Sequence, residues 1–132
     1  MKVIFVKDND SLEQFKQEFS KSPVSILSYT APWCGACQQF KPRWNNACEN
    51  AKGNGLLANI PQDFFNELEG INNDVHFLPT VKIFKNGKFH EDWDGNWGNP
   101  GSLDALFHKM FSTQNKTKQT NKLAKGIKKL NL

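Results

Sequence analysis

Two cysteines separated by two residues are the part of this sequence best suited to chemistry. They lie in the segment Trp33-Cys34-Gly35-Ala36-Cys37, where a hydrophobic run gives way to a helical pattern. A thiol at the start of a helix faces unpaired backbone N–H groups and the positive end of the helix dipole, which stabilise its thiolate. We therefore predict that Cys34 attacks a disulfide and that Cys37, one turn later, resolves the mixed disulfide by attacking Cys34.

A zinc site is the alternative use of this pair. A structural zinc site needs four nitrogen or sulfur ligands, usually supplied as two pairs. Cys48 follows Cys37 by 11 residues, which on a helix is about 16 Å along the axis and beyond disulfide reach. We therefore expect no metal, no bound cofactor and a reversible Cys34–Cys37 disulfide, with Cys48 filling the core; a regulatory or dimer-forming thiol is the other interpretation of Cys48. The remaining candidate ligands, none at paired spacing, are His76, His90 and His108.

The elements that must position the cysteines alternate between strands and helices. Asp10, followed by Glu13, has the pattern of a capping box, and Ser102 is expected to cap the last helix. Asn86-Gly87 predicts a two-residue hairpin turn. The order β-α-β-α-β-α-β-β-α predicts an α/β fold with a mixed central sheet and helices on both faces. Strand patterns cover 3–7, 24–30, 56–60, 79–84 and 88–93, and helical patterns cover 10–22, 34–51, 62–68 and the segment from 102.

Five motifs follow one another along the chain: Ala31-Pro32-Trp33-Cys34-Gly35-Ala36-Cys37, Pro42, Leu78-Pro79-Thr80, Lys85-Asn86-Gly87 and Gly95. With these motifs, residues 3–111 resemble the thioredoxin and protein disulfide isomerase family. The resemblance implies the thioredoxin fold and thiol-disulfide oxidoreductase activity. It also implies that Pro79 is cis, with the backbone of Leu78 able to pair with a substrate near Cys34, and that Gly95 lines the substrate groove. We expect Trp33 to shield the dithiol and to offer an apolar contact to the substrate; a purely packing role is the other interpretation of Trp33.

Three supporting positions depart from the family pattern. Ser28 stands where the family usually buries a carboxylate, and Leu57 where the thioredoxin branch has a lysine. A hydroxyl can relay a proton through water but cannot hold one as an anionic base, so we expect slower deprotonation of Cys37. Between the cysteines, next to Gly35, Ala36 replaces the proline or histidine of the best-known branches. Because Ala36 is uncharged, we favour reduction of substrates over disulfide formation.

The resemblance implies a monomer with two kinds of partner, namely protein disulfide substrates and an upstream thiol reductant or reductase. A different class stays open, a thioredoxin-fold interaction or structural module with slow or idle redox chemistry and a basic binding tail. Ser28 and Leu57 favour that class, whereas the intact cysteines, Pro79 and Gly95 oppose it.

Charge and hydropathy divide the chain into a domain and a tail. The 132 residues, 38% of them hydrophobic, suit one core. Six of the 17 basic residues lie in 112–132, which has no acidic residue, so residues 1–111 carry 11 basic against 13 acidic groups. We expect a thioredoxin-like domain over 1–111 and a Lys-rich disordered tail over 112–132. Contact of the tail with an anionic surface or nucleic acid is the alternative.

The sequence also bears on location and source. No window reaches the roughly 20 apolar residues needed to cross a bilayer, and the first residues lack the pattern of a secretory leader. We therefore expect an intracellular, cytoplasmic protein. The abundance of Asn and Lys fits an AT-rich genome, such as that of a large DNA virus.

Overall fold

The computed structural model describes residues 1–71 and 74–112, so the expected tail lies outside the described residues apart from Ser112. The strands are β1 (Lys2–Phe5), β2 (Val24–Thr30), β3 (Leu56–Pro61), β4 (Thr80–Lys85) and β5 (Lys88–Asp92). The helices are α1 (Asn9–Lys21), α2 (Gly35–Asn50) and α3 (Ser102–Phe107), with a 3-10 helix η1 (Gln62–Glu67) and a π-helical turn η2 (His108–Ser112). Across these described ranges no helix combines the length and apolar character needed to cross a membrane.

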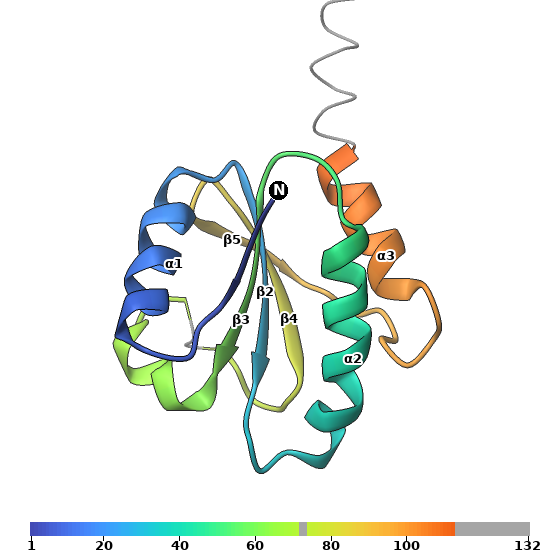
Figure 1. The fold of residues 1–132 in the computed structure, drawn as a ribbon, viewed down its shortest axis with the longest axis horizontal. Helices are drawn as coiled ribbons and strands as arrows, with labels where there is room; N and C mark the ends of the chain where they lie inside the picture. Colours follow the sequence, from blue (N-terminus) through green and yellow to red (C-terminus); the bar gives the residue numbers. More distant parts are fainter. Residues whose placement is uncertain (72–73, 113–132) are drawn as a thin grey trace, which may run out of the picture.

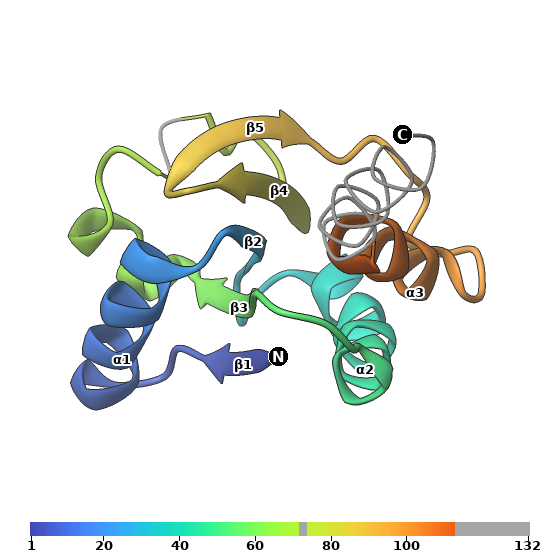
Figure 2. The same cartoon turned by 90° about the horizontal axis from the view of Figure 1, so that it is seen from above.

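The five strands form one mixed sheet in the order β1-β3-β2-β4-β5. The strands β1, β3 and β2 run parallel to one another, and β4 is antiparallel to both of its neighbours, β2 and β5. Helix α1 covers one face of the sheet, and α2 and α3 cover the other (Figures 1 and 2). The predicted thioredoxin fold, with a mixed sheet between helices, is confirmed.

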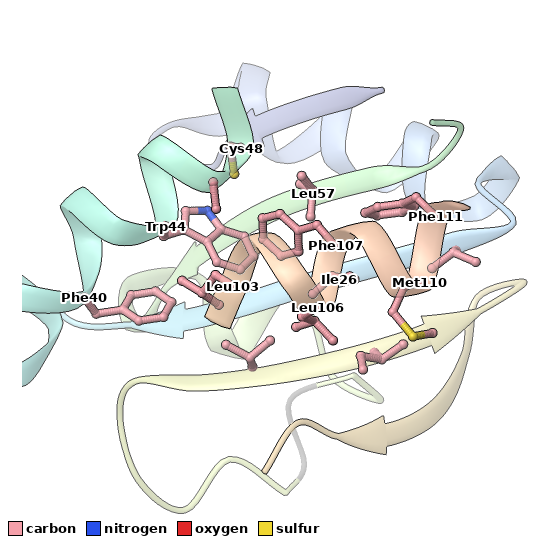
Figure 3. Close-up of a cluster of buried hydrophobic side chains, with 14 residues drawn as sticks. Ile26, Phe40, Trp44, Cys48, Leu57, Leu103, Leu106, Phe107, Met110 and Phe111 are labelled. Atoms are coloured by element: carbon pink, nitrogen blue, oxygen red, sulfur yellow. The ribbon is translucent and has the colours of Figure 1, made fainter. Parts of the chain in front are cut away.

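Strand β2 lies in the middle of the sheet, and its side chains belong to two hydrophobic clusters. Ile26 belongs to the cluster under α2 and α3, which we call the α2–α3 cluster, whereas Leu27 and Tyr29 belong to the cluster under α1. Burial of a large apolar side chain contributes about 1.5–3 kcal/mol, so a strand buried on both faces is held firmly. Figure 3 shows the α2–α3 cluster, where Trp44 and Phe107 meet edge to face.

The start of α1 differs from the prediction. Asp8, not Asp10, is the N-cap: its Oδ1 accepts from the backbone N–H of Ser11 at 2.8 Å, and Ser11 Oγ accepts from the Asp8 N–H at 3.1 Å. The predicted Asp10–Glu13 capping box is wrong because the Ser11 hydroxyl completes a reciprocal box earlier in the chain. The hydrogen bonds from Ser11 also hold the pKa of Asp8 below its ordinary value.

The start of α3 differs as well. Gly101 is the N-cap, with a φ of 80° that favours glycine, and it makes no side-chain capping bond. The predicted cap, Ser102, instead lies in the first turn, where its hydroxyl donates to the Asn96 carbonyl at 2.7 Å. Ser102 therefore closes the preceding loop instead of capping the helix.

Two further predictions concern a hairpin turn and a short helix. The hairpin turn at Asn86 and Gly87 is confirmed: both have positive φ, 53° and 76°, the backbone of the tight turn that twists with its strands. The helix predicted at 62–68 is a 3-10 helix that ends with the Leu68 N–H donating to the Phe65 carbonyl.

Candidate redox site

The two cysteines lie where β2 ends and α2 begins. Cys34 is the N-cap of α2, and its Sγ accepts the backbone N–H of Cys37 at 3.1 Å. The Cys34 N–H donates to the Ala31 carbonyl at 3.2 Å, which holds the turn that leads from the strand into the helix. A disulfide joins Cys34 and Cys37, whose Cα atoms are 5.2 Å apart. The pair therefore closes the ring that the spacing predicted.

Both cysteines are largely covered, although the residues between them are not. Cys34 is 7% exposed and Cys37 3%, whereas Gly35 and Ala36 are exposed in the first turn of α2. A Cβ placed on Gly35 would meet nothing within 4 Å. The surface beside the disulfide is thus open, and neither residue between the cysteines carries a charge.

The segment before β4 lies against Cys34. The Leu78–Pro79 peptide bond is cis, as the resemblance implied, and the Leu78 carbonyl oxygen lies 3.7 Å from Cys34 Sγ. Leu78 also packs against the small cluster of Ala31, Cys34 and Cys37. Because β4 runs antiparallel to β2 with Thr80 opposite Tyr29, the start of β4 meets the end of β2.

Two aromatic side chains near the disulfide are exposed. Trp33 is 71% exposed, and its Nε1 donates to Gln62 Oε1 of η1 at 2.7 Å, which fixes the indole. Phe77 is 73% exposed, and its carbonyl accepts the Thr80 hydroxyl. Phe77 was not predicted; its place directly before Leu78 was the available signal.

Gly95 lies in a hollow beside Pro79. The hollow has a volume of about 320 Å³, and Phe77, Trp93 and Trp97 also line it. A Cβ on Gly95 would overlap the Trp93 indole, 2.6 Å from its Nε1 and closer to two ring carbons. The fold therefore brings Gly95 and Pro79 together, and the indole packs where a side chain at 95 would otherwise stand.

A neutral polar network occupies the position of the family's buried carboxylate. Ser28 is fully buried, and its Oγ accepts from Asn59 Nδ2 at 2.8 Å. Asn59 Nδ2 also donates to Thr30 Oγ1 at 3.1 Å. Leu57 is fully buried in the α2–α3 cluster. Thr30 and Asn59 were not predicted. The available signal was their spacing: Thr30 lies two residues after Ser28 in β2, and Asn59 lies two residues after Leu57 in β3, so each pair shares one face of its strand.

Cys48 is the remaining described thiol, and it is free. It is 5% exposed within the α2–α3 cluster, near Trp44 (Figure 3), in agreement with its predicted place in the core. Burial, with a smaller effect from Glu49, raises the pKa of Cys48 to about 12. Its thiol is therefore protonated at neutral pH. Among residues 1–71 and 74–112, no three His, Cys, Asp or Glu side chains group as metal ligands.

Comparisons with known proteins agree with this geometry. A family model described as Thioredoxin matches residues 5–110. "Probable thioredoxin-2" of Caenorhabditis elegans is 37% identical over 84 residues, which cover 63% of this chain and 57% of that protein. "Probable protein disulfide-isomerase ER-60" of Schistosoma mansoni is 28% identical over 102 residues, 76% of this chain and 20% of that protein. The chain thus matches less than two thirds of the length of either relative.

A solved structure shares the fold. The oxidised thioredoxin of Plasmodium falciparum superposes with a TM-score of 0.61 at 23% identity, covering 83% of this chain and 98% of that one. At this identity the likeness concerns the fold alone.

Proposed function

Because the chain belongs to the thioredoxin family, we propose that it reduces disulfides in protein substrates, with Cys34 as the nucleophile and Cys37 as the resolving thiol. The position of Cys34 carries this proposal. Its sulfur accepts the Cys37 N–H at the N-cap of α2, so a thiolate there gains a hydrogen bond and the positive end of the helix dipole.

The reaction follows from the positions of the two sulfurs. The Cys34 thiolate attacks one sulfur of the substrate disulfide, and the other substrate sulfur leaves as a thiolate. Cys37 then loses its proton and attacks Cys34 Sγ, the bond from Cys34 to the substrate breaks, and the second substrate thiolate leaves. Two electrons pass from the dithiol to the substrate, and the Cys34–Cys37 disulfide remains until an upstream thiol reductant restores the dithiol.

The residues around Cys34 support the binding of an extended substrate segment. The Leu78 carbonyl, 3.7 Å from Cys34 Sγ, is in reach of a backbone N–H of a substrate. Exposed Trp33 offers an apolar surface beside the nucleophile, and Pro79 and Gly95 line the adjoining hollow. These groups place a substrate sulfur near Cys34 without selecting a particular sequence.

The uncharged turn between the cysteines supports the reductase direction. Ala36 supplies no cation beside Cys34, so the thiolate is stabilised by the helix terminus alone, and a less stabilised dithiol is a stronger reductant. The reductase direction needs a compartment that keeps the upstream donor reduced, and we therefore place the protein in the cytoplasm. Fluorescent tagging at either end in the source cells tests this location.

An insulin-reduction assay tests the proposal. The unaltered protein with a thiol donor is expected to precipitate reduced insulin, and Cys34→Ser to abolish the activity. Equilibration with glutathione tests the direction: a potential near −270 mV, as in thioredoxins, supports a reductase, and one near −180 mV, as in protein disulfide isomerases, contradicts it, both values being about those typical of each branch. Cys37→Ser should leave the mixed disulfide in place, so that substrates trapped on Cys34 can be identified.

A second candidate function rests on the neutral network. The family buries a carboxylate and a lysine at this place. This chain has no ionisable group there, because the residues are Ser28, Asn59 and Leu57. This observation favours an interaction module whose redox chemistry is slow. The same assay separates the two functions, because a module would not reduce insulin at a rate that depends on Cys34.

A further inference from the structure

A cleft open to solvent reaches the resolving cysteine from the α2 side of the sheet. It has a volume of about 270 Å³ and is lined from β1, β2, β3 and α2. Cys37 and Trp44 lie in its buried part, and Gln38 and Lys41 are exposed at its rim. It shares no lining residue with the hollow beside Pro79. A small solute can therefore approach Cys37 by a route separate from the proposed substrate surface.

Water enters this cleft because the cleft opens between exposed residues and is large enough to hold it. Its volume of about 270 Å³ compares with about 30 Å³ for one water molecule in the liquid. Trp44 Nε1 and Asn45 Oδ1 belong to cleft residues but are buried beneath its surface, without a hydrogen-bond partner among the described residues. The volume of the cleft, and not these two atoms, therefore places water close to Cys37.

The cleft offers water but no base. None of its lining residues carries a carboxylate or an imidazole, and apart from Cys37 its ionisable side chain is the Lys41 ammonium. Next to it, the Ser28 hydroxyl is bonded to the Asn59 amide, which is bonded to the Thr30 hydroxyl. Hydroxyl and amide groups do not take up a proton near neutral pH. A proton that leaves Cys37 therefore has no acceptor among these side chains.

We propose that a base dissolved in the water of this cleft deprotonates Cys37, in place of a carboxylate of the protein. The proposal rests on the proposed function, because it concerns the second step of that reaction. The base takes the proton from the Cys37 thiol, and the thiolate attacks Cys34 Sγ. The bond between Cys34 and the substrate sulfur breaks, and the substrate leaves as a thiolate that is later protonated by water. Lys41 at the rim favours anionic bases such as hydrogen phosphate.

A chromogenic aromatic disulfide separates the two steps. Mixed with the reduced protein, it releases one coloured thiolate when Cys34 attacks and a second when Cys37 resolves the mixed disulfide. Hydrogen phosphate or imidazole is varied at constant pH and ionic strength. The second phase should accelerate by about twofold or more over a tenfold range of buffer, and the first should not. A second phase that ignores buffer concentration overturns the proposal, whereas a missing first phase overturns the proposed function.

Paired variants test the route. Asn45→Leu replaces an amide that lines the cleft by a larger, apolar side chain and should reduce the dependence on buffer by about threefold or more. Asn46→Leu is the control, because Asn46 is exposed one residue further and does not line the cleft. Equal buffer dependence in the two variants contradicts the route. The buffer series on the unaltered protein decides the proposal by itself if Asn45→Leu fails to fold.

Restoring a carboxylate gives the opposite test. Ser28→Asp places a carboxylate beside Asn59 and should accelerate the second phase by about tenfold at the lowest buffer concentration. The dependence on buffer should then be weaker, since the protein supplies its own base. A second phase no faster than that of the unaltered protein would show that deprotonation does not limit this step, which contradicts the proposal.

Discussion

We expect Cys48 to lower the free energy of unfolding of the protein as the pH rises above 9. Burial raises the pKa of its thiol to about 12, from an ordinary value of 9.0. Below pH 9 both states hold the proton and stability is at its full value. Above pH 9 the unfolded chain loses the proton while the native protein keeps it, so the free energy of unfolding falls by about 1.4 kcal/mol per pH unit. The loss attributable to Cys48 reaches about 3 kcal/mol near pH 11 and about 4 kcal/mol near pH 12.

Urea unfolding of the oxidised protein over this pH range measures the effect. In that form Cys34 and Cys37 do not titrate, because they are joined in the disulfide. Burial also raises the pKa of Tyr29, and its contribution is common to the unaltered protein and to Cys48→Ala, so it cancels in their difference. The variant should lose about 3 kcal/mol less between about pH 8 and pH 11. Parallel curves for the two proteins would refute the reasoning.

Two further predictions concern the substrate hollow and the end of the domain. Gly95→Ala forces a methyl group into the Trp93 indole, and this overpacking should lower the free energy of unfolding by about 1–3 kcal/mol and raise the KM for insulin. Gly98→Ala is the control, because its methyl group meets one exposed side-chain oxygen at 3.0 Å, and it should change neither the stability nor the KM. Equal behaviour of the two variants would contradict the placement of Gly95 in the substrate hollow. We also propose that the domain ends at residue 111. A chain of residues 1–111 should reduce insulin at a rate within about twofold of that of the full chain. Phe111→Ala removes a fully buried ring and should lower the free energy of unfolding by about 3–5 kcal/mol. Loss of insulin reduction in the shortened chain would place the boundary later.

Helix starts were the least predictable local features. Asp10 with Glu13 and Asp8 with Ser11 are both acceptable capping pairs by residue type, and the chain uses the second. The choice depends on where β1 ends and on how α1 lies on the sheet, which places Leu12 and Phe15 in the core. Ser102 was similar: its hydroxyl bonds the Asn96 carbonyl because the loop before α3 turns back on itself.

The residue types and their spacing were sufficient for the local features. The two-residue gap between Cys34 and Cys37 is one helical turn, so the ring that joins them depends on α2 alone. The turn at Asn86-Gly87 was equally local, because the positive φ angles it requires suit those residues. The order of strand and helix patterns, with a hairpin and a helix at the end, was enough to predict a mixed sheet between helices.

Residue types and spacing alone did not decide which distant residues meet the dithiol; Leu78 was expected there through the family resemblance, and the tertiary structure supplied the geometry. The Leu78 carbonyl reaches Cys34 across 44 residues because β4 pairs antiparallel with β2, and a shift of one residue in that register would turn its side chains to the other face. The Ser28–Asn59–Thr30 network likewise needs β2 and β3 in register. Such contacts depend on long-range pairing, whose geometry no local pattern encodes.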